Sequence, residues 1–164
     1  MQQFAVYARV QLVDPPAWLD AYRIKYQQRY DFHVTLKQPC GIDDAIVPEI
    51  RDRFVQFAAP NQAIAVDFSQ LVVDGPTDDD ACIMLNAAPN PMLMDLQRQL
   101  VALYGEFTAY RKPQLEQYER SFRPHLTLIH NLEPEQFQLA RAELPSDLQL
   151  KGSIEELVLA VVKD

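Results

Sequence analysis

One five-residue pattern occurs twice in this chain, once in each half. Phe32–Leu36 reads FHVTL and Pro124–Leu128 reads PHLTL, so each copy has a histidine and a threonine two residues apart, each followed by an aliphatic residue. Side chains alternate between the two faces of an extended strand. We therefore expect each copy to be a strand that buries its aliphatic residues and presents the histidine and threonine together. Two such strands facing one cleft would supply two imidazoles and two hydroxyls, a set suited to acid–base chemistry on a phosphate.

The order of the expected elements is also the same in the two halves, residues of about 1–75 and 81–164. Hydrophobic periodicity in each half predicts a strand, a helix, the motif strand, a helix and a strand. Prolines favour the first turn of a helix, and four of them lie near the expected helix starts: Pro15, Pro48, Pro91 and Pro134. The second half is longer by a polar stretch, Thr108–Ser121, which we expect to be a loop. The pattern predicts a single α+β domain over residues 1–164, with two lobes and one H-x-T motif in each half.

Composition and charge narrow the classes of function. The chain has 164 residues, enough for one domain with a core, and its 48% hydrophobic and 23% charged residues are ordinary for a globular protein. The net charge of −8 argues against a long nucleic-acid surface, because such binding needs cations that displace counterions from phosphates. A net negative charge is still compatible with binding of a small anionic ligand or of the end of a polynucleotide. The chain has no long apolar run and no basic segment followed by an apolar one, so we expect a cytoplasmic protein with no membrane partner.

A single H-x-T pattern is weak evidence, because threonine is common in strands and most strand histidines are structural. The pair is stronger evidence, since two of the three histidines carry the same pattern on matching elements. The third, His130, is a useful comparison. It lies five positions after His125, so on a regular strand it would face the opposite way. We therefore expect His130 at a strand end or on the surface, without a catalytic role.

The same alternation selects four candidates for substrate binding. Lys37 has the strand parity of the first motif, and Arg123 has that of the second. Tyr7 and Arg9 lie on the more polar face of the first expected strand. Cations at these positions would favour a phosphate, whereas the alternative is that they are solvated charges at strand ends.

The polar stretch in the second half combines rings with positive charge. It contains Tyr110, Arg111, Lys112, Tyr118 and Arg120. Rings stack on nucleic-acid bases and guanidinium groups bind phosphates, so this stretch could close over a nucleotide. The alternative is an exposed loop with no role.

The two motifs resemble the H-x-[ST]-x signatures of the two-histidine (2H) phosphoesterase superfamily. The matching residues are His33-Val34-Thr35-Leu36 and Arg123-Pro124-His125-Leu126-Thr127-Leu128. Within the superfamily, the 2′-5′ RNA ligase-like branch of RNA 2′,3′-cyclic phosphodiesterases is the most similar, in motif separation and element order, over nearly the whole chain. The resemblance implies two pseudo-symmetric lobes around a central cleft. Each lobe would be an antiparallel sheet with helices on its outer face.

The resemblance also implies a reaction, the hydrolysis of 2′,3′-cyclic phosphodiesters of nucleotides or RNA ends. Opening such a ring needs a base for the attacking water and an acid for the departing ribose oxygen, and histidine does either near neutral pH. By family analogy His33 is the acid and His125 the base, which gives a 2′-phosphate, whereas reversed roles would give a 3′-phosphate. Thr35 and Thr127 would donate to the non-bridging oxygens. Ligation of 2′-5′ ends is the corresponding reverse reaction.

The remaining expectations concern ligands and competing mechanisms. We expect no cofactor and no metal, since the chain lacks H-x-H and H-E-x-x-H and its Cys40 and Cys82 lack ligand spacing. A nucleophilic thiol would need one of these cysteines beside a histidine, and no pattern favours that. The expected partner is a small nucleotide or an RNA 3′-end with a cyclic phosphate, bound by a monomer. The alternative to an enzyme is a non-catalytic module that binds nucleotides or RNA ends on the same fold.

Overall fold

The computed structural model describes residues 2–59, 62–74 and 81–163. Within them the chain forms six strands, five α-helices and one short 3₁₀ turn at Asp44–Ile46. In chain order the strands and α-helices are β1 (Gln2–Val13), α1 (Trp18–Lys25), β2 (His33–Ile42), α2 (Val47–Ala58), β3 (Ile64–Asp74), β4 (Cys82–Ala87), α3 (Pro91–Leu103), α4 (Pro113–Arg120), β5 (His125–His130), α5 (Pro134–Glu143) and β6 (Leu150–Lys163). This is the expected element order of both halves, with α4 added in the polar stretch that we expected to be a loop.

The six strands form one sheet in the order β2-β1-β6-β3-β4-β5, and all neighbours are antiparallel. The predicted antiparallel α+β class is confirmed, although the sheets of the two lobes are continuous with each other because β6 pairs with both β1 and β3. The order is palindromic: exchanging β1 with β4, β2 with β5 and β3 with β6 reverses it. The last strand of each half therefore lies among the strands of the other half.

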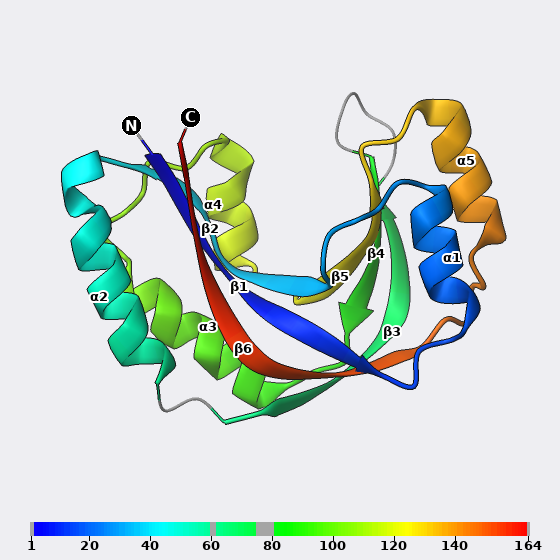
Figure 1. Ribbon diagram of the computed structural model, residues 1–164, viewed down its shortest axis with the longest axis horizontal. Coiled ribbons are helices and arrows are strands. Elements are labelled where there is room, and N and C mark those ends of the chain that lie inside the picture. The colour runs from blue at the N-terminus through cyan, green and yellow to red at the C-terminus, as the bar shows by residue number, and fades with distance from the viewer. Residues whose placement is uncertain (1, 60–61, 75–80, 164) are drawn as a thin grey trace.

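Helices cover the sheet in two groups (Figure 1). Helices α2, α3 and α4 lie at the end formed by β2, β1 and β6, and helices α1 and α5 lie at the end formed by β3, β4 and β5. Each sheet end with its helices is called a lobe below. In the second lobe the hydroxyl of Tyr22 in α1 donates to the carbonyl of Ala140 in α5 over 2.8 Å. Helix α3 begins as the sequence predicts, with Pro91 in its first turn and the Asn90 side chain accepting from the Leu93 amide.

Alternation along the strands separates two faces of the sheet. One face is apolar and buried, and it supplies core residues such as Val6, Val34 and Leu126. The opposite face carries the two histidines and two threonines of the motifs, and we call it the motif face. Burial of Val34 and Leu126 beside half-buried motif residues is the pattern expected from the sequence.

Both motif strands contain a β-bulge directly after the H-x-T triplet. In β2, Thr35 lies opposite Tyr7 while Lys37 lies opposite Val6, so one residue of β2 is extra. In β5 the same displacement follows Thr127, because Ile129 rather than residue 128 lies opposite Ile83. A bulge of one residue reverses the alternation of side chains beyond it. The two halves therefore repeat each other even in this irregularity.

Candidate active site

The two motif histidines are held in the same way. Nδ1 of His33 lies 2.9 Å from the carbonyl oxygen of Asp31, and Nδ1 of His125 lies 2.9 Å from that of Arg123. A carbonyl oxygen only accepts hydrogen bonds, so Nδ1 carries the proton in both rings and the lone pair of the neutral imidazole is on Nε2. Each backbone contact spans two residues and fixes the ring orientation. Both histidines thus keep Nε2 for a reacting group.

Cross-strand neighbours surround the two motifs symmetrically on the motif face. In the first lobe His33 lies opposite Arg9, and in the second lobe His125 lies opposite Asn86. Opposite residues of an antiparallel pair share a face. Asn86 donates from Nδ2 to Oε1 of Gln70 over 3.3 Å, in the position where Arg9 contacts an acid in the other lobe. Sequence reasoning missed Asn86 and Gln70, although the alternation of β4 against β5 could have identified them.

His33 acts electrostatically on His125. Burial lowers the pKa of His125 below its ordinary value of 6.5, and the charge of His33 lowers it further, while the Arg123 carbonyl opposes the shift. The strands that carry these two histidines, β2 and β5, contact each other although they are the two edges of the sheet. The structure thus brings both predicted histidines to one place. Near neutral pH His125 is the unprotonated imidazole.

Two predicted substrate-binding residues, Tyr7 and Arg9, lie on the motif face beside His33. The ring centroids of Tyr7 and His33 are 5.0 Å apart. Arg9 forms an ion pair of 2.6 Å with Glu156 of β6, and its Nε lies 3.4 Å from Asp31. These two carboxylates offset the charge of Arg9, so the first strand supplies a compensated cation rather than a free one.

Arg123 has a different position from the one expected. It lies just before β5, with its side chain exposed, so strand parity does not place it. Its carbonyl nevertheless orients His125. Part of its role is therefore played by the main chain, and a role for its guanidinium in substrate binding stays a prediction.

Lys37 does not lie on the motif face, and the parity argument for it was wrong. The bulge after Thr35 turns Lys37 to the buried face, where its side chain is 1% exposed and its Nζ lies 2.9 Å from Glu119 of α4. A lysine that is buried and paired in this way is not available to a substrate. Its role is to join β2 to the segment that contains α4.

His130 also lies on the face opposite to the one that parity predicts. The bulge after Thr127 brings it opposite Cys82, and therefore onto the motif face. Its ring centroid lies 4.7 Å from that of Tyr30, whose own centroid is 6.2 Å from that of His33. Sequence reasoning missed Tyr30, and its position three residues before the first motif gives no periodic signal.

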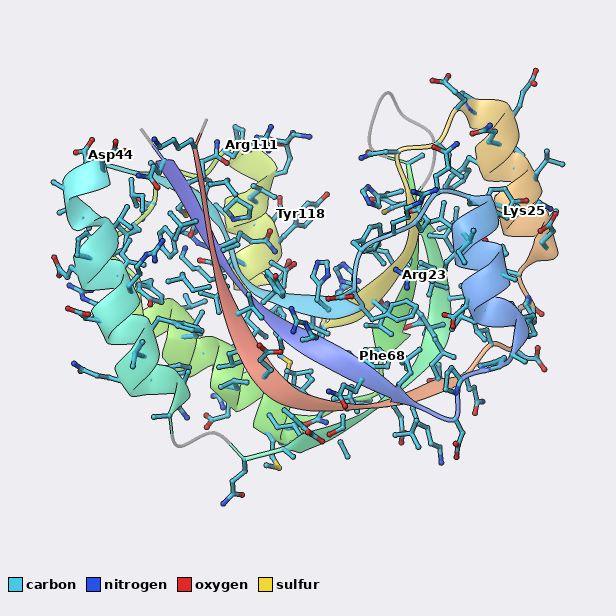
Figure 2. The ribbon with its side chains drawn as sticks, viewed as in Figure 1. Arg23, Lys25, Asp44, Phe68, Arg111 and Tyr118 are labelled. Atoms are coloured by element: carbon cyan, nitrogen blue, oxygen red, sulfur yellow. The ribbon has the colours of Figure 1, made fainter. Side chains whose placement is uncertain are left out.

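The polar stretch that precedes β5 packs along the edge of β2. The amide of Gly41 donates to the Ala109 carbonyl over 2.7 Å, and the amide of Arg111 donates to the Pro39 carbonyl over 3.2 Å. The stretch covers this sheet edge, as edge strands require. Figure 2 shows Tyr118 extending from α4 toward the space between the lobes, and the residue is 54% exposed. A contact of this stretch with a nucleotide stays a prediction.

A protein-family model describes the chain over residues 8–164, that of the 2′-5′ RNA ligase superfamily. The chain belongs to this superfamily, whose members are 2H phosphoesterases. Among solved structures it is similar to Usb1 of Kluyveromyces marxianus, with a TM-score of 0.55 and 11% identity over 99% of this chain and 95% of that chain. At this identity the likeness shows the fold. No curated protein matches the sequence significantly.

Membership of this superfamily supports a phosphoesterase or ligase enzyme. No helix in the described part of the chain is long and apolar enough to cross a membrane.

Proposed function

We propose that this protein is a metal-independent phosphodiesterase that hydrolyses 2′,3′-cyclic phosphates of nucleotides or RNA 3′-ends. The observation that carries the proposal is the pair of imidazoles, His33 and His125, which are fixed identically through Nδ1 and belong to the two edge strands that approach each other. Two Nε2 atoms beside two threonine hydroxyls are the groups that opening a cyclic phosphate requires.

In the proposed reaction His125 is the base and His33 is the acid. Nε2 of neutral His125 takes a proton from a water molecule as its oxygen bonds to phosphorus. The bond from phosphorus to one ribose oxygen breaks, and Nε2 of protonated His33 gives that oxygen its proton. The lowered pKa of His125 supports its role as the base, because it is unprotonated near neutral pH. Family resemblance adds the expectation that the product is a 2′-phosphate.

Thr35 and Thr127 are the proposed donors to the non-bridging oxygens. Each follows its histidine by two residues, so each lies on the motif face next to an imidazole. Negative charge is held on these oxygens while phosphorus is five-coordinate, and a hydroxyl already in place stabilises that state. Tyr7 and Arg123 are proposed to contact the rest of the substrate.

The test is hydrolysis of 2′,3′-cyclic nucleotides and of RNA with a cyclic phosphate end, in the presence of EDTA, followed by ³¹P NMR. Turnover is expected in the unmodified protein, with losses of about 10²–10⁴-fold in His33→Ala and in His125→Ala. Arg98→Ala is the control, since it breaks only an exposed ion pair with Asp95 on α3. Turnover that persists in both motif variants would refute the proposal. Binding of a cyclic nucleotide without turnover would instead select the non-catalytic module.

A further inference from the structure

The two motif strands have no direct backbone connection. They are the outermost strands of the sheet, and no ladder joins β2 to β5 within the described residues. The position of one imidazole relative to the other therefore depends on four intervening strands or on side chains that bridge the two edges. An acid and a base that act on opposite oxygens of one phosphate must be held at a defined separation, because a displacement of about 1 Å at a reacting group costs about 10²-fold in rate.

One buried side chain, Gln28, bridges the two edges. Its amide pairs with the backbone of His130, the last residue of β5. Nε2 donates to the His130 carbonyl over 3.1 Å, and Oε1 accepts from the His130 amide over 3.2 Å. Nε2 also donates to the carbonyl of Tyr26 over 2.8 Å, and Oε1 also accepts from the hydroxyl of Tyr30 over 2.8 Å. The amide thus donates two hydrogen bonds and accepts two. The two that it shares with His130 resemble the pair that a neighbouring β-strand residue would form.

The end of α1 places Gln28 at this point. Gln27 has a left-handed conformation with φ 59°, and its amide donates to the Ile24 carbonyl over 3.0 Å. The amide of Gln28 donates to the Arg23 carbonyl over 2.8 Å, which completes a Schellman motif. The Arg23 guanidinium lies 3.9 Å from the ring centroid of Phe32, directly before β2, and Figure 2 shows Arg23 between α1 and the strands. The segment from α1 to β2 is therefore fixed at both ends.

The same amide controls the ring next to His33. Tyr30 donates its hydroxyl to Oε1 of Gln28, and its ring lies between those of His33 and His130, at 6.2 Å and 4.7 Å. Burial raises the pKa of Tyr30 to about 12, so the hydroxyl stays a donor at neutral pH. The side chain of Gln28 thus binds the backbone of β5, the strand that carries His125. Through the Tyr30 hydroxyl it also holds the ring next to His33.

We infer that Gln28 is a positioning residue for the two-histidine site, which sets the separation of His33 and His125 by tying the start of β2 to the end of β5. This inference rests on the proposed function for its kinetic consequence. Its structural consequence is independent of turnover, since His33 lowers the pKa of His125 in the protein without substrate.

The experiment compares Gln28→Met with Gln97→Met in the full chain. Both glutamines are buried, and Gln97 of α3 donates to the carbonyl of Glu119 of α4 over 3.2 Å, which is a contact between two helices rather than between the motif strands. Methionine keeps the shape of glutamine and removes its hydrogen bonds. We expect kcat to fall about 10- to 100-fold in Gln28→Met with KM within about twofold, and kcat to stay within about twofold in Gln97→Met. Tyr30→Phe, which keeps the amide pair, is expected to lose less than Gln28→Met.

A second readout is the NMR titration of the histidine rings. Moving the rings apart and admitting water both raise the pKa of His125 toward its ordinary 6.5, so we expect this rise in Gln28→Met and not in Gln97→Met. If Gln28→Met leaves kcat and the His125 titration unchanged, or if Gln97→Met alters them as much as Gln28→Met does, the inference is wrong. If the unmodified protein has no turnover, the proposed function fails while the titration still decides the inference. If Gln28→Met does not fold, Gln28→Asn decides it, because the shorter side chain withdraws the amide from the His130 backbone: an unchanged kcat and titration overturn the inference.

Discussion

Lys37 and Glu119 form a buried ion pair directly behind the strand that carries His33. Nζ lies 2.9 Å and 3.1 Å from the two carboxylate oxygens, and the side chains are 1% and 3% exposed. The carboxylate also accepts from the hydroxyl of Tyr110 over 2.7 Å and from the amide of Gln38 over 2.8 Å. Burial alone would lower the pKa of Lys37, but Glu119 raises it above its ordinary value. This pair fixes α4 to β2 just beyond the first motif.

Removing one partner of this pair should destabilise the fold. Glu119→Gln leaves a buried lysine without its counter-charge, so we expect the free energy of unfolding to fall by about 3–5 kcal/mol. Urea denaturation measures the loss. Arg98→Ala is the control, because it breaks an exposed ion pair with Asp95 and should cost less than about 1 kcal/mol. Equal losses in the two variants would show that the buried pair contributes no more than a surface one.

Stability should also depend on pH through His125. Its pKa in the folded protein lies below the ordinary 6.5, so the unfolded chain binds more protons just below pH 6.5. The contribution of His125 to the free energy of unfolding is therefore present above pH 6.5 and is lost as the pH falls through the pKa of the folded protein. We expect the unfolding free energy of the unmodified protein to fall more steeply below pH 6.5 than that of His125→Asn. Parallel curves in denaturation series at several pH values would contradict this.

Glu156 is expected to weaken the binding of an anionic substrate. Its carboxylate lies 2.6 Å from the guanidinium of Arg9, and Arg9 is the residue that lies opposite His33 in the sheet. Glu156→Gln keeps the shape and removes one of the two carboxylates that offset Arg9, so Arg9 should attract a phosphate more strongly. We expect KM to fall about two- to fivefold at low salt with little change in kcat, since the pair is largely exposed. Glu155→Gln removes the same charge from the neighbouring residue, and a similar fall there would assign the effect to net charge.

The left-handed conformation of Gln27 predicts a stabilising substitution. A side chain at φ 59° is strained by about 1–2 kcal/mol relative to glycine, which adopts this conformation freely. Gln27→Gly should therefore raise the unfolding free energy, by less than this strain because glycine also makes the unfolded chain more flexible. Thermal unfolding measures the change. Ala21→Gly, within α1, is the opposite control and should destabilise the protein by about 1 kcal/mol.

Alternation and repetition in the sequence predicted most of the fold and the centre of the site. They predicted the element order, the antiparallel class and the two strands that present His33 and His125. They failed beyond each bulge, because one extra residue reverses every later side chain. The adjacent buried pair Leu128–Ile129 is a trace of this irregularity, since strict alternation would expose one of the two. Lys37 gave no such trace, because its partner Glu119 lies 82 residues away.

The side-chain contacts that join the two edges of the sheet could not be predicted from the sequence either. Gln28 reaches His130 across 102 residues, and an amide on a helix–strand connection has no periodicity that would indicate a buried partner. Such contacts follow from the curvature of the sheet, which brings its two edges together. Curvature is a property of the folded strands as a set rather than of any one segment.

The palindromic strand order has a consequence for how this molecule could be divided. Strand β3 of the first half has β6 and β4 as its neighbours, and both belong to the second half. A chain cut between β3 and β4 would yield two fragments that each lack partners for one strand, and each fragment would carry only one of the two motif histidines. Recovery of the two-histidine site would require the two fragments to associate. The rate of this association would rise with the concentration of both fragments.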